Sequence, residues 1–520
     1  MTEDALRSPQ VLVDALRDVN AFPEKTENVE FVQTQMSFVF LTDAFAYKIK
    51  KPVNLGYLDY TTLDKRLHFC NKELELNRRL AFGVYLAVLP VVRCGTRIAI
   101  GGEGEVIEYA VKMKRLPLEQ LLDHLLLTGE VTETMVVQIA EKVAAFHKSA
   151  ASGAEIGKFG ELNAIRHNTD ENFDQTAKYI GASITDKQYK RIRAFTDGFM
   201  QKNESLFTAR VSQGRIKDCH GDLHAAHICF FEGITIFDCI EFSDRFRYCD
   251  VASEVTFLAM DIDRYGRADL SRAFIDAYVQ QSGDTDIYRL LNFYKCYRAY
   301  VRGKVESFKL DDPYIADKNV PLSAARTYFS LAERYAREKP VVLLLAGLTG
   351  TGKTTVAEAL ARRAGFVVIS SDVVRKNLAH VPLTEHHYAD FKSDIYTGDF
   401  TRRTYDEMFV RARHALARGQ WVILDASFKD RQDRITAKVL AGEAAADLFI
   451  AECVLDEHEV KKRLEQRLRD GSVSDGRWEI YKAQKGEFEA ITEISPEEHI
   501  VVDTSGYIDD TINRILEKVA

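Results

Sequence analysis

The sequence predicts an α+β unit at residues 1–338, followed by an α/β unit with a parallel sheet at residues 339–520. Three observations lead to this prediction. In the second unit, short apolar runs alternate with helical stretches, which is the pattern of a parallel sheet covered on both faces. A charged amphipathic helix is expected at Leu322–Arg337, and an apolar strand pattern begins directly after Pro340. No low-complexity tract or long Gly/Ser linker separates the two units, so we expect them to touch.

The composition is that of an ordinary soluble globular protein. The formal net charge of −8 gives no basic surplus that would favour nucleic acid or an anionic membrane as a partner. The first residues lack the pattern of a secretory signal, and no apolar run approaches the roughly 20 residues that span a bilayer. None of the eight cysteines forms a C-x-x-C pair, so buried reduced thiols are expected. We therefore expect a cytoplasmic protein, and its oligomeric state stays open.

Five apolar runs supply the expected strands of the second unit. They are Val341–Ala346, Phe366–Ser370, Trp421–Leu424, Ile450–Val454 and His499–Val502. A helix is expected directly after the first of them, at Thr354–Ala364. In an open parallel sheet, ligands gather outside the carboxyl ends of the strands, so the residues that follow each strand are the candidates for chemistry.

The segment between the first strand and its helix reads G-L-T-G-T-G-K-T and matches the phosphate-binding pattern G-x-x-x-x-G-K-[ST]. Its glycines let backbone N–H groups converge on the α- and β-phosphates, beside the positive end of the helix dipole. Lys353 would reach the β- and γ-phosphates, and the Thr354 hydroxyl would bind Mg²⁺. A glycine-rich turn between packed elements is the alternative. The predicted nucleotide-binding residues are Gly347, Leu348, Thr349, Gly350, Thr351, Gly352, Lys353, Thr354 and Thr355.

Polar residues also follow the other strands. Asp425 ends the run that begins at Trp421, the arrangement in which an Asp holds Mg²⁺ beside a phosphate loop, although a helix N-cap gives the same pattern. Asp372 follows the second strand and could accept the proton of an attacking hydroxyl. Arg375 lies on the same helical face and could hold an acceptor or a phosphate. An N-cap Asp with a solvated Arg is the alternative for this pair.

Arginines cluster farther on, around the loop 470–476. They are Arg463, Arg467, Arg469 and Arg477. A basic flexible segment could close over a triphosphate as a lid and neutralise charge in the transition state. A solvated helix followed by a loop explains the same residues equally well.

Residues 341–520 resemble the small-molecule kinase branch of P-loop proteins, which includes gluconate kinase, shikimate kinase, chloramphenicol phosphotransferase and zeta-toxin-like kinases. The S-x-D-x-x-R element that begins at Ser370 is also similar to that of polynucleotide kinases. This resemblance implies that Asp372 is the base that activates the acceptor hydroxyl and that Arg375 contacts the acceptor. Arg467 and Arg477 would be lid residues.

The first unit carries two carboxylates that are typical of phosphoryl transfer when they occur together. Cys219-His-Gly-Asp-Leu-His places Asp222 on a turn, and Ile234-Thr-Ile-Phe-Asp places Asp238 at the end of an apolar strand. The first carboxylate can take an acceptor proton, and the second can bind Mg²⁺ that bridges the phosphates.

Upstream of these carboxylates, residues 44–50 predict a strand on which Lys48 and Lys50 share one face. A helix is expected to follow at Thr62–Leu80. Glu73 on this helix is a candidate partner that orients a strand lysine toward the phosphates. An exposed Lys–Glu pair on a solvated helix is the alternative.

Residues 30–310 resemble the aminoglycoside phosphotransferase and choline kinase-like fold, a relative of the protein kinases. The whole chain resembles the family described as bifunctional aminoglycoside phosphotransferase/ATP-binding proteins. The resemblance implies a bilobal protein-kinase-like domain, with an N-lobe at about 1–115, a C-lobe at about 116–338 and a hinge at Met113–Leu118 that meets adenine. Its functional residues would be nucleotide-binding Lys48 and Glu73, catalytic Asp222 and metal-binding Asp238.

Two features depart from that family. No G-x-G-x-x-G precedes Lys48, where the corresponding hairpin is Thr34–Phe38. His227 stands at the position of the family's metal-binding Asn, five residues after Asp222, and is the candidate second metal residue. Because Mg²⁺ prefers oxygen ligands, an imidazole suits it less well than an amide does.

Taken together, these patterns predict an enzyme: an ATP- and Mg²⁺-dependent phosphotransferase that acts on the hydroxyl group of a small molecule. ATP is the expected donor in both units, with GTP left open for the first. One alternative is a 5′-hydroxyl kinase for nucleotides or polynucleotides. The other is a regulatory protein whose first unit only binds a nucleotide or ligand and gates the second. The acceptor itself is not predicted, because acceptor pockets are built from loops whose shape the sequence does not reveal.

Overall fold

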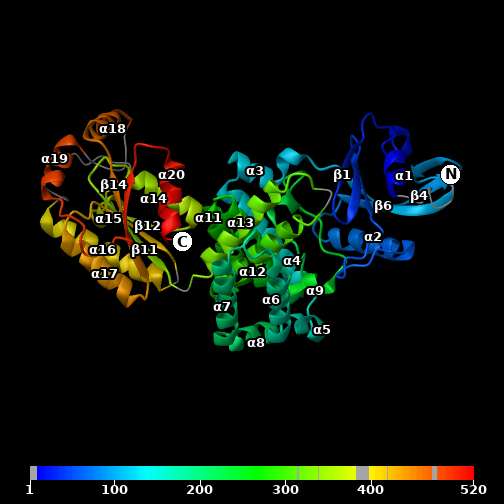
Figure 1. The fold of residues 1–520 in the computed structure, drawn as a ribbon, viewed down its shortest axis with the longest axis horizontal. Helices are drawn as coiled ribbons and strands as arrows, with labels where there is room; N and C mark the ends of the chain where they lie inside the picture. Colours follow the sequence, from blue (N-terminus) through cyan, green and yellow to red (C-terminus); the bar gives the residue numbers. More distant parts are fainter. Residues whose placement is uncertain are drawn as a thin grey trace. The chain divides into compact units, whose positions relative to one another are not determined.

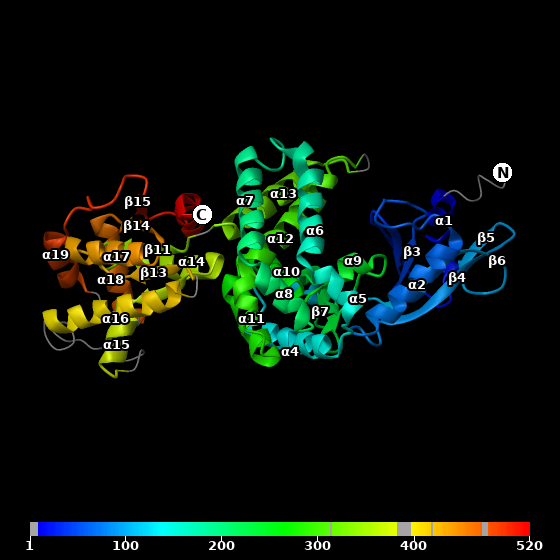
Figure 2. The same cartoon turned by 90° about the horizontal axis from the view of Figure 1, so that it is seen from below.

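The computed structural model describes residues 9–312, 315–337, 339–381, 397–417, 420–470 and 477–519, without the side chains of 467–470. The chain divides into two compact units (Figures 1 and 2). One is formed by Met1–Tyr265 and Leu270–Tyr335, and the other by Gly266–Asp269 and Ala336–Ala520. Among the helices of these described residues, none is long and apolar enough to cross a membrane.

The first unit begins with a six-stranded antiparallel sheet in the order β1-β2-β3-β6-β4-β5. Its strands are β1 (Glu30–Gln33), β2 (Ser37–Leu41), β3 (Phe45–Lys50), β4 (Tyr85–Cys94), β5 (Arg97–Ile100) and β6 (Glu105–Lys114). Helix α1 (Pro9–Ala15) supplies Val13 to one apolar cluster of this sheet. Helix α2 (Leu63–Asn77) packs on β4 and β6.

Strand β3 separates apolar from charged side chains by its period of two. Tyr47 and Ile49 pack in the cluster that contains Val13, whereas the amino groups of Lys48 and Lys50 both reach Glu73 on α2. Helix α2 is shorter at its end than the expected Thr62–Leu80. Thr62 is its N-cap rather than a helical residue, because its hydroxyl accepts the N–H of Lys65.

The remainder of the first unit is mainly helical. Its helices are α3 (Leu122–Thr128), α4 (Glu133–Ser149), α5 (Ala154–Gly157), α6 (Leu162–Thr176), α7 (Asp186–Lys202), α8 (Glu204–Ser212), α9 (Asp244–Arg247), α10 (Val251–Arg264), α11 (Ala268–Ser282), α12 (Ile287–Phe308) and α13 (Asn319–Tyr335). Short antiparallel strand pairs lie among them: β7 (Ile216–Asp218) with β10 (Tyr248–Asp250), and β8 (Ile228–Cys229) with β9 (Thr235–Ile236). Helix α10 is buried along almost its whole length, which makes it the centre of this region.

In the second unit, five parallel strands form a sheet in the order β12-β13-β11-β14-β15, which confirms the predicted parallel sheet. The strands are β11 (Val341–Ala346), β12 (Val367–Ser370), β13 (Val422–Asp425), β14 (Asp447–Val454) and β15 (His499–Asp503). The helices are α14 (Lys353–Ala364), α15 (Ser371–Leu378), α16 (Gly398–Leu416), α17 (Arg431–Glu443), α18 (Glu457–Asp470), α19 (Trp478–Glu487) and α20 (Ile508–Val519).

The central strand β11 is apolar throughout because both faces of this sheet are covered. Val342, Leu344 and Ala346 pack with α16 and α17, and the alternate residues pack with α14 and α20 (Figure 1). Since all five strands run in parallel, their carboxyl ends lie at one edge. From β11 the chain crosses over β13 to reach β12, and after β13 it passes to the other side of β11 to form β14, so this edge contains the topological switch point at which ligands bind.

Candidate functional site

The phosphate loop of the second unit joins β11 to α14. Gly347 has a φ of 136°, and a Cβ there would lie 2.5 Å from the backbone oxygen of Cys453, so the loop passes too close to β14 for any side chain. Gly352 is the left-handed N-cap of α14, with a φ of 88°. These two glycines turn the loop so that the N-terminus of α14 faces the edge at which the strands end.

Lys353, Thr354 and Asp425 meet beside this loop. The Lys353 amino group donates to the carbonyl oxygen of Leu348 at 2.8 Å and so arches over the loop. The Thr354 hydroxyl donates to Oδ2 of Asp425 at 2.9 Å, because β13 places Asp425 next to Leu345 of β11. Burial raises the pKa of Asp425, although the charge of Lys353 acts in the opposite direction. A buried carboxylate beside a hydroxyl is an oxygen donor set that suits Mg²⁺.

A cavity of about 780 Å³ connects these residues with those that follow β12. Its lining includes Lys353, Thr354, Asp425, Asp372 and Arg375. The last two lie on α15, which begins directly after β12. The structure therefore brings the predicted phosphate, metal and acceptor residues of the second unit to a single cavity.

The same cavity contains charged residues that the motifs did not reveal. Lys429 and Asp430 lie in the loop after β13, where the rule that ligands gather beyond strand ends could have found them. Arg402 and Asp433 come from α16 and α17, and no local pattern marks them. Burial and the neighbouring Asp430 raise the pKa of Asp433. The acceptor side of the cavity thus presents both acids and bases.

Two of the expected lid residues have different outcomes. Arg477 is the N-cap residue of α19, and its side chain is absent from the lining of the cavity as the described residues define it. The side chain of Arg467 lies outside the described residues. Gln484 of α19 reaches the phosphate loop and accepts the Thr349 N–H at 2.9 Å. Arg463 of α18 donates to the carbonyl of Thr504, and the Thr504 hydroxyl donates in turn to the Thr351 carbonyl of the loop at 2.7 Å. Arg463 belongs to the predicted arginine cluster and reaches the loop through Thr504, whereas Gln484 was not predicted.

In the first unit, Lys48 connects the sheet with the helical region. Its amino group lies 2.9 Å from Oε1 of Glu73 and 2.6 Å from Oδ1 of Asp238. Burial alone would lower the pKa of Lys48, but the charges of Asp238 and Glu73 outweigh it and raise that pKa well above its usual value. The structure thus assembles three predicted residues that are distant in sequence into one ion-pair chain.

Lys50 and Glu241 extend this chain and were not predicted as functional. The Lys50 amino group is buried and lies 2.6 Å from Oε2 of Glu73, and it also pairs with Glu241. Tyr60 donates its hydroxyl to Glu241 at 2.6 Å. Glu73 is therefore held by two lysines, which fixes the carboxylate that faces Lys48.

Asp222 and two histidines lie beside Asp238 (side-chain exposures 32% and 39% for the two carboxylates). Oδ2 of Asp222 is 3.6 Å from Nε2 of His224, and Oδ2 of Asp238 is 3.6 Å from Nε2 of His227. Burial opposes ionisation of Asp222, but the two imidazoles nevertheless lower its pKa. Burial and the neighbouring His224 lower the pKa of His227 to about 4.

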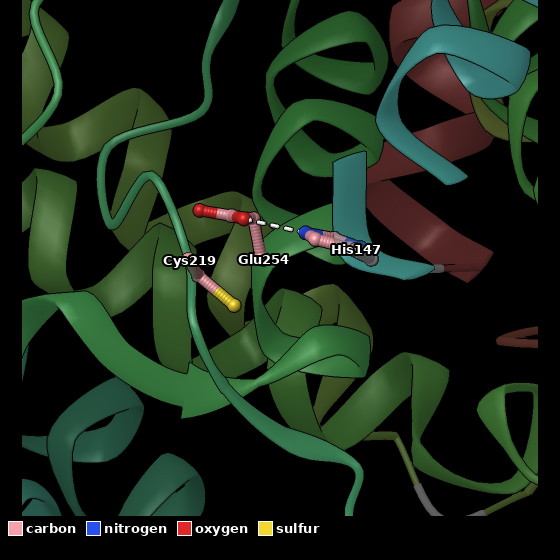
Figure 3. A group of neighbouring side chains, drawn as sticks. All are labelled: His147, Cys219 and Glu254. Atoms are coloured by element: carbon pink, nitrogen blue, oxygen red, sulfur yellow. Dashed lines mark hydrogen bonds and ion pairs between the residues drawn. The ribbon is translucent and has the colours of Figure 1, made fainter. Parts of the chain in front are cut away.

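Glu254 of α10 fixes the turn that carries Asp222 by hydrogen bonds to its backbone. This carboxylate accepts the backbone N–H groups of His220 at 2.8 Å and Gly221 at 2.6 Å. It also pairs with Nε2 of His147 at 2.7 Å, as Figure 3 shows, while Nδ1 of His147 is 2.7 Å from the Tyr278 hydroxyl. Cys219 lies next to this pair, but both imidazole nitrogens already have partners, so the group is a buried support rather than a metal centre.

Mg²⁺ fits the two sites differently. In the second unit, Thr354 and Asp425 offer oxygen atoms only. In the first unit, two imidazole nitrogens stand among the carboxylates of Asp222 and Asp238, and a hard ion such as Mg²⁺ binds imidazole poorly. The donor set of the first unit therefore does not fit Mg²⁺.

Comparison with known proteins places the chain. A family model described as an AAA domain matches residues 342–491. The uncharacterized protein Rv2004c of Mycobacterium tuberculosis (strain ATCC 25618 / H37Rv) is 32% identical over 457 residues, which is 88% of this chain and 89% of that protein. This chain belongs to the same family. The uncharacterized protein Mb2027c of Mycobacterium bovis, another member, matches with the same identity and coverage.

Solved structures also resemble part of the chain. A gluconokinase from Sinorhizobium meliloti 1021 is 19% identical, with a TM-score of 0.26, and covers 35% of this chain and 93% of its own. The Mycobacterium tuberculosis APS kinase CysC, solved in complex with AMPPNP and APS, is 16% identical, with the same TM-score, and covers 35% of this chain and 98% of its own.

Proposed function

We propose that this protein is an ATP- and Mg²⁺-dependent phosphotransferase whose second unit transfers the γ-phosphoryl group to a hydroxyl group of a small molecule. One observation carries the proposal. The cavity that is lined by Lys353, Thr354 and Asp425 of the phosphate side is also lined by Asp372 and Arg375. Phosphoryl transfer needs positioning and charge neutralisation rather than covalent catalysis, and this cavity offers groups for both.

Each side chain has a specific task in this proposal. The loop N–H groups and Lys353 bind the phosphates and offset the charge that gathers on the γ-phosphoryl oxygens. Thr354 and Asp425 would hold Mg²⁺, which neutralises the β- and γ-phosphates. Asp372 accepts the proton of the acceptor hydroxyl as its oxygen attacks phosphorus. Arg375, which donates to the Thr401 hydroxyl at 3.1 Å, holds the acceptor or the transferred group.

The acceptor side of the cavity favours a polar metabolite. Arg402, Lys429, Asp430 and Asp433 line it together with Glu489. A site of paired acids and bases binds hydroxyl, carboxylate or amine groups by hydrogen bonds, and it disfavours an apolar substrate because buried polar groups would lose their partners.

We further propose that residues 1–338 form an aminoglycoside phosphotransferase- and choline kinase-like domain that binds ATP or GTP. The ion-pair chain of Lys48, Glu73 and Asp238, with Asp222 close by, supports this proposal. Lys48 would hold the phosphates, and Asp222 would accept the acceptor proton.

A regulatory role for the first unit is the second candidate. The observation that favours it is the donor set around Asp222, which contains imidazoles where Mg²⁺ would need oxygen atoms. In that case the first unit would bind its ligand without turnover and would alter the activity of the second.

A single screen tests these proposals. The full-length protein is incubated with ATP, Mg²⁺ and a metabolite library that includes sugars, sugar acids, amino alcohols, nucleosides and 5′-hydroxyl oligonucleotides. We expect a phosphorylated product that Asp372→Asn removes. A product that persists in Asp372→Asn and disappears in Asp222→Asn would assign the chemistry to the first unit instead. An oligonucleotide product would identify a 5′-hydroxyl kinase, and no product with any acceptor would contradict the enzymatic proposal.

A further inference from the structure

Three donor side chains converge at the turn that carries Asp222. Asp222, His224 and His227 each offer one ligand atom, and these atoms lie within 4.8 Å of one another. Asp238 lies next to this group: its Oδ2 is 3.6 Å from Nε2 of His227, and its Oδ1 is bound by Lys48. One carboxylate and two imidazoles of this turn thus lie close enough together to share an ion, and the carboxylate of Asp238 lies beside them.

The protonation of His227 follows from its backbone partner. Its Nδ1 is 3.0 Å from the carbonyl oxygen of Asp222, and a carbonyl can only accept, so Nδ1 carries the proton. In the neutral ring, Nε2 is then an acceptor, and it faces the carboxylate of Asp238. Two acceptors that face one another repel unless a hydrogen-bond donor or a cation binds both, and a cation is one group that fits.

Two nitrogen–oxygen separations in this region suit neighbouring metal ligands better than hydrogen-bond partners. Nε2 of His224 is 3.6 Å from Oδ2 of Asp222, the same separation as between Nε2 of His227 and Oδ2 of Asp238. Both separations exceed the range of a nitrogen–oxygen hydrogen bond, about 2.7–3.2 Å. Neighbouring ligands that lie about 2.0–2.2 Å from an ion in tetrahedral geometry are about 3.3–3.6 Å apart.

The surroundings of this group include a carboxylate, Asp261, and a third histidine, His220. Oδ2 of Asp261 lies 4.0 Å from Nδ1 of His224, too far for a hydrogen bond, and it accepts the Ala225 N–H at 2.9 Å instead. His220 cannot join the site, because Nε2 donates to the Phe237 carbonyl and Nδ1 accepts the Asp222 N–H.

We propose that the first unit binds a divalent first-row transition-metal ion through Asp222, His224 and His227, beside Asp238. Mixed nitrogen and oxygen ligands bind such ions far better than Mg²⁺, which prefers oxygen alone. The inference deepens the function proposed for the first unit and rests on it for the position of the nucleotide, next to Asp238. Ion binding itself requires no turnover, so the two can fail separately.

The test uses the full-length protein without nucleotide and with Mg²⁺ in 100-fold excess, so that oxygen-only sites are occupied by Mg²⁺. Titration with Mn²⁺ is followed by electron paramagnetic resonance, and titration with Co²⁺ by visible absorption. We expect one tightly held ion per chain, with electron spin echo modulation from imidazole nitrogen. Mn²⁺ that Mg²⁺ displaces at equal concentration, or bound Mn²⁺ without nitrogen modulation, would overturn the proposal.

Variants locate the ion. His224→Asn and His227→Asn should each weaken Co²⁺ binding by about tenfold or more. His227→Asn should also reduce the preference for Mn²⁺ over Mg²⁺, because an amide oxygen replaces nitrogen. His124→Asn, at an exposed position of α3 in the same unit, is the matched control and should bind as the wild type does. Unchanged binding in both site variants would overturn the proposal.

Two safeguards separate the outcomes. Circular dichroism shows whether each variant folds. If a variant does not fold, the electron spin echo modulation from imidazole nitrogen in the wild-type protein shows whether histidines bind the ion. Ion binding without any transfer that depends on Asp222 would support the proposal and contradict phosphotransfer by the first unit. Transfer that depends on Asp222 with Mg²⁺ alone, in a protein that binds no transition-metal ion, would support phosphotransfer by the first unit and contradict the metal-binding proposal.

Discussion

Asp425 illustrates at the scale of one residue how function opposes stability. Its carboxylate is buried at the end of β13, and burial raises its pKa, so the charged form costs free energy in the folded chain. The fold keeps this carboxylate next to the Thr354 hydroxyl, where the two groups can hold a cation. Such residues are expected where a site is built for a ligand that arrives later.

Asp425→Asn should therefore stabilise the second unit at neutral pH, in the absence of Mg²⁺ and nucleotide, by an amount of the order of 1 kcal/mol. A group whose folded-state pKa is raised stabilises the fold below its unfolded pKa and loses that contribution as the pH rises through the folded pKa. The gain of the variant should thus disappear as the pH falls below about 3.8, the ordinary value for Asp. Thermal unfolding across this pH range measures it, and an equal gain at all pH values would contradict the assignment.

Lys353→Ala removes the cation that we propose faces the phosphates. Phosphoryl transfer by the second unit should fall on the order of 10²-fold or more, because charge stabilisation of the transition state is lost. The assay uses Asp222→Asn as background, so that only the second unit is observed. Lys518→Ala, at an exposed position of α20, is the control and should retain activity. Undiminished turnover in Lys353→Ala would show that the loop does not take part in phosphoryl transfer.

Asp372→Asn should lower transfer to the acceptor by about 10²–10⁴-fold while ATP affinity changes little, because a general base acts in the transition state. Steady-state kinetics and calorimetric ATP binding measure the two effects. Asp510→Asn on α20 serves as the control for loss of a surface carboxylate. If ATP binding weakens as much as transfer does, Asp372 instead binds a metal ion or stabilises the fold.

At the scale of elements, α10 decides where Asp222 lies. Glu254 of this buried helix accepts two backbone N–H groups of the turn. Burial alone would raise its pKa, but His147, His220 and the Gly221 N–H outweigh burial and lower that pKa to about 2. A carboxylate with a depressed pKa stabilises the fold above its unfolded pKa and loses this contribution as the pH falls through the folded value.

Glu254→Gln should destabilise the first unit by about 1–3 kcal/mol at neutral pH, because an amide cannot accept all of these donors. The difference from the wild type should shrink as the pH falls from about 4.5 toward 2. Denaturant unfolding at several pH values measures it, with Glu204→Gln at the exposed start of α8 as control. A constant difference over this range would mean that the ionised carboxylate is not the stabilising form.

At the scale of the whole molecule, each unit has its own apolar core. The core of the first unit is built around α10 and around the six-stranded sheet on which α2 packs. The core of the second unit is built on the two faces of β11. Domains with separate cores unfold as separate cooperative units unless an extensive interface couples them.

Calorimetry of the full-length protein should therefore show two unfolding transitions. ATP with Mg²⁺ at 100 times its Kd should raise the transition of the second unit by about 2.7 kcal/mol, and Lys353→Ala should reduce that shift. Co²⁺ alone should raise the other transition in the wild type but much less in His227→Asn. A single transition that shifts with both ligands would show that the units unfold together.

Local sequence determined most of the second unit. The five strands were predicted within a few residues, and the parallel sheet is confirmed, because a strand buried on both faces reads as a continuous apolar run such as Val341–Ala346. The pattern of the phosphate loop could also be recognised in the sequence, because its glycines, Lys353 and Thr354 are adjacent in the chain. These patterns involve residues that are adjacent in the sequence, so they can be recognised without knowledge of the fold.

Tertiary structure alone decided which distant side chains meet. Lys50 and Glu241 are far apart in sequence, and no spacing rule joins them, yet both hold the chain that orients Lys48. The pairing of His224 with Asp222 and of His227 with Asp238 likewise depends on how the turn packs against the end of β9. The sequence therefore determined the loop, the strands and the carboxylates, whereas long-range packing decided the donor set around them, because contacts between remote residues arise only when α10 and the strands are in place.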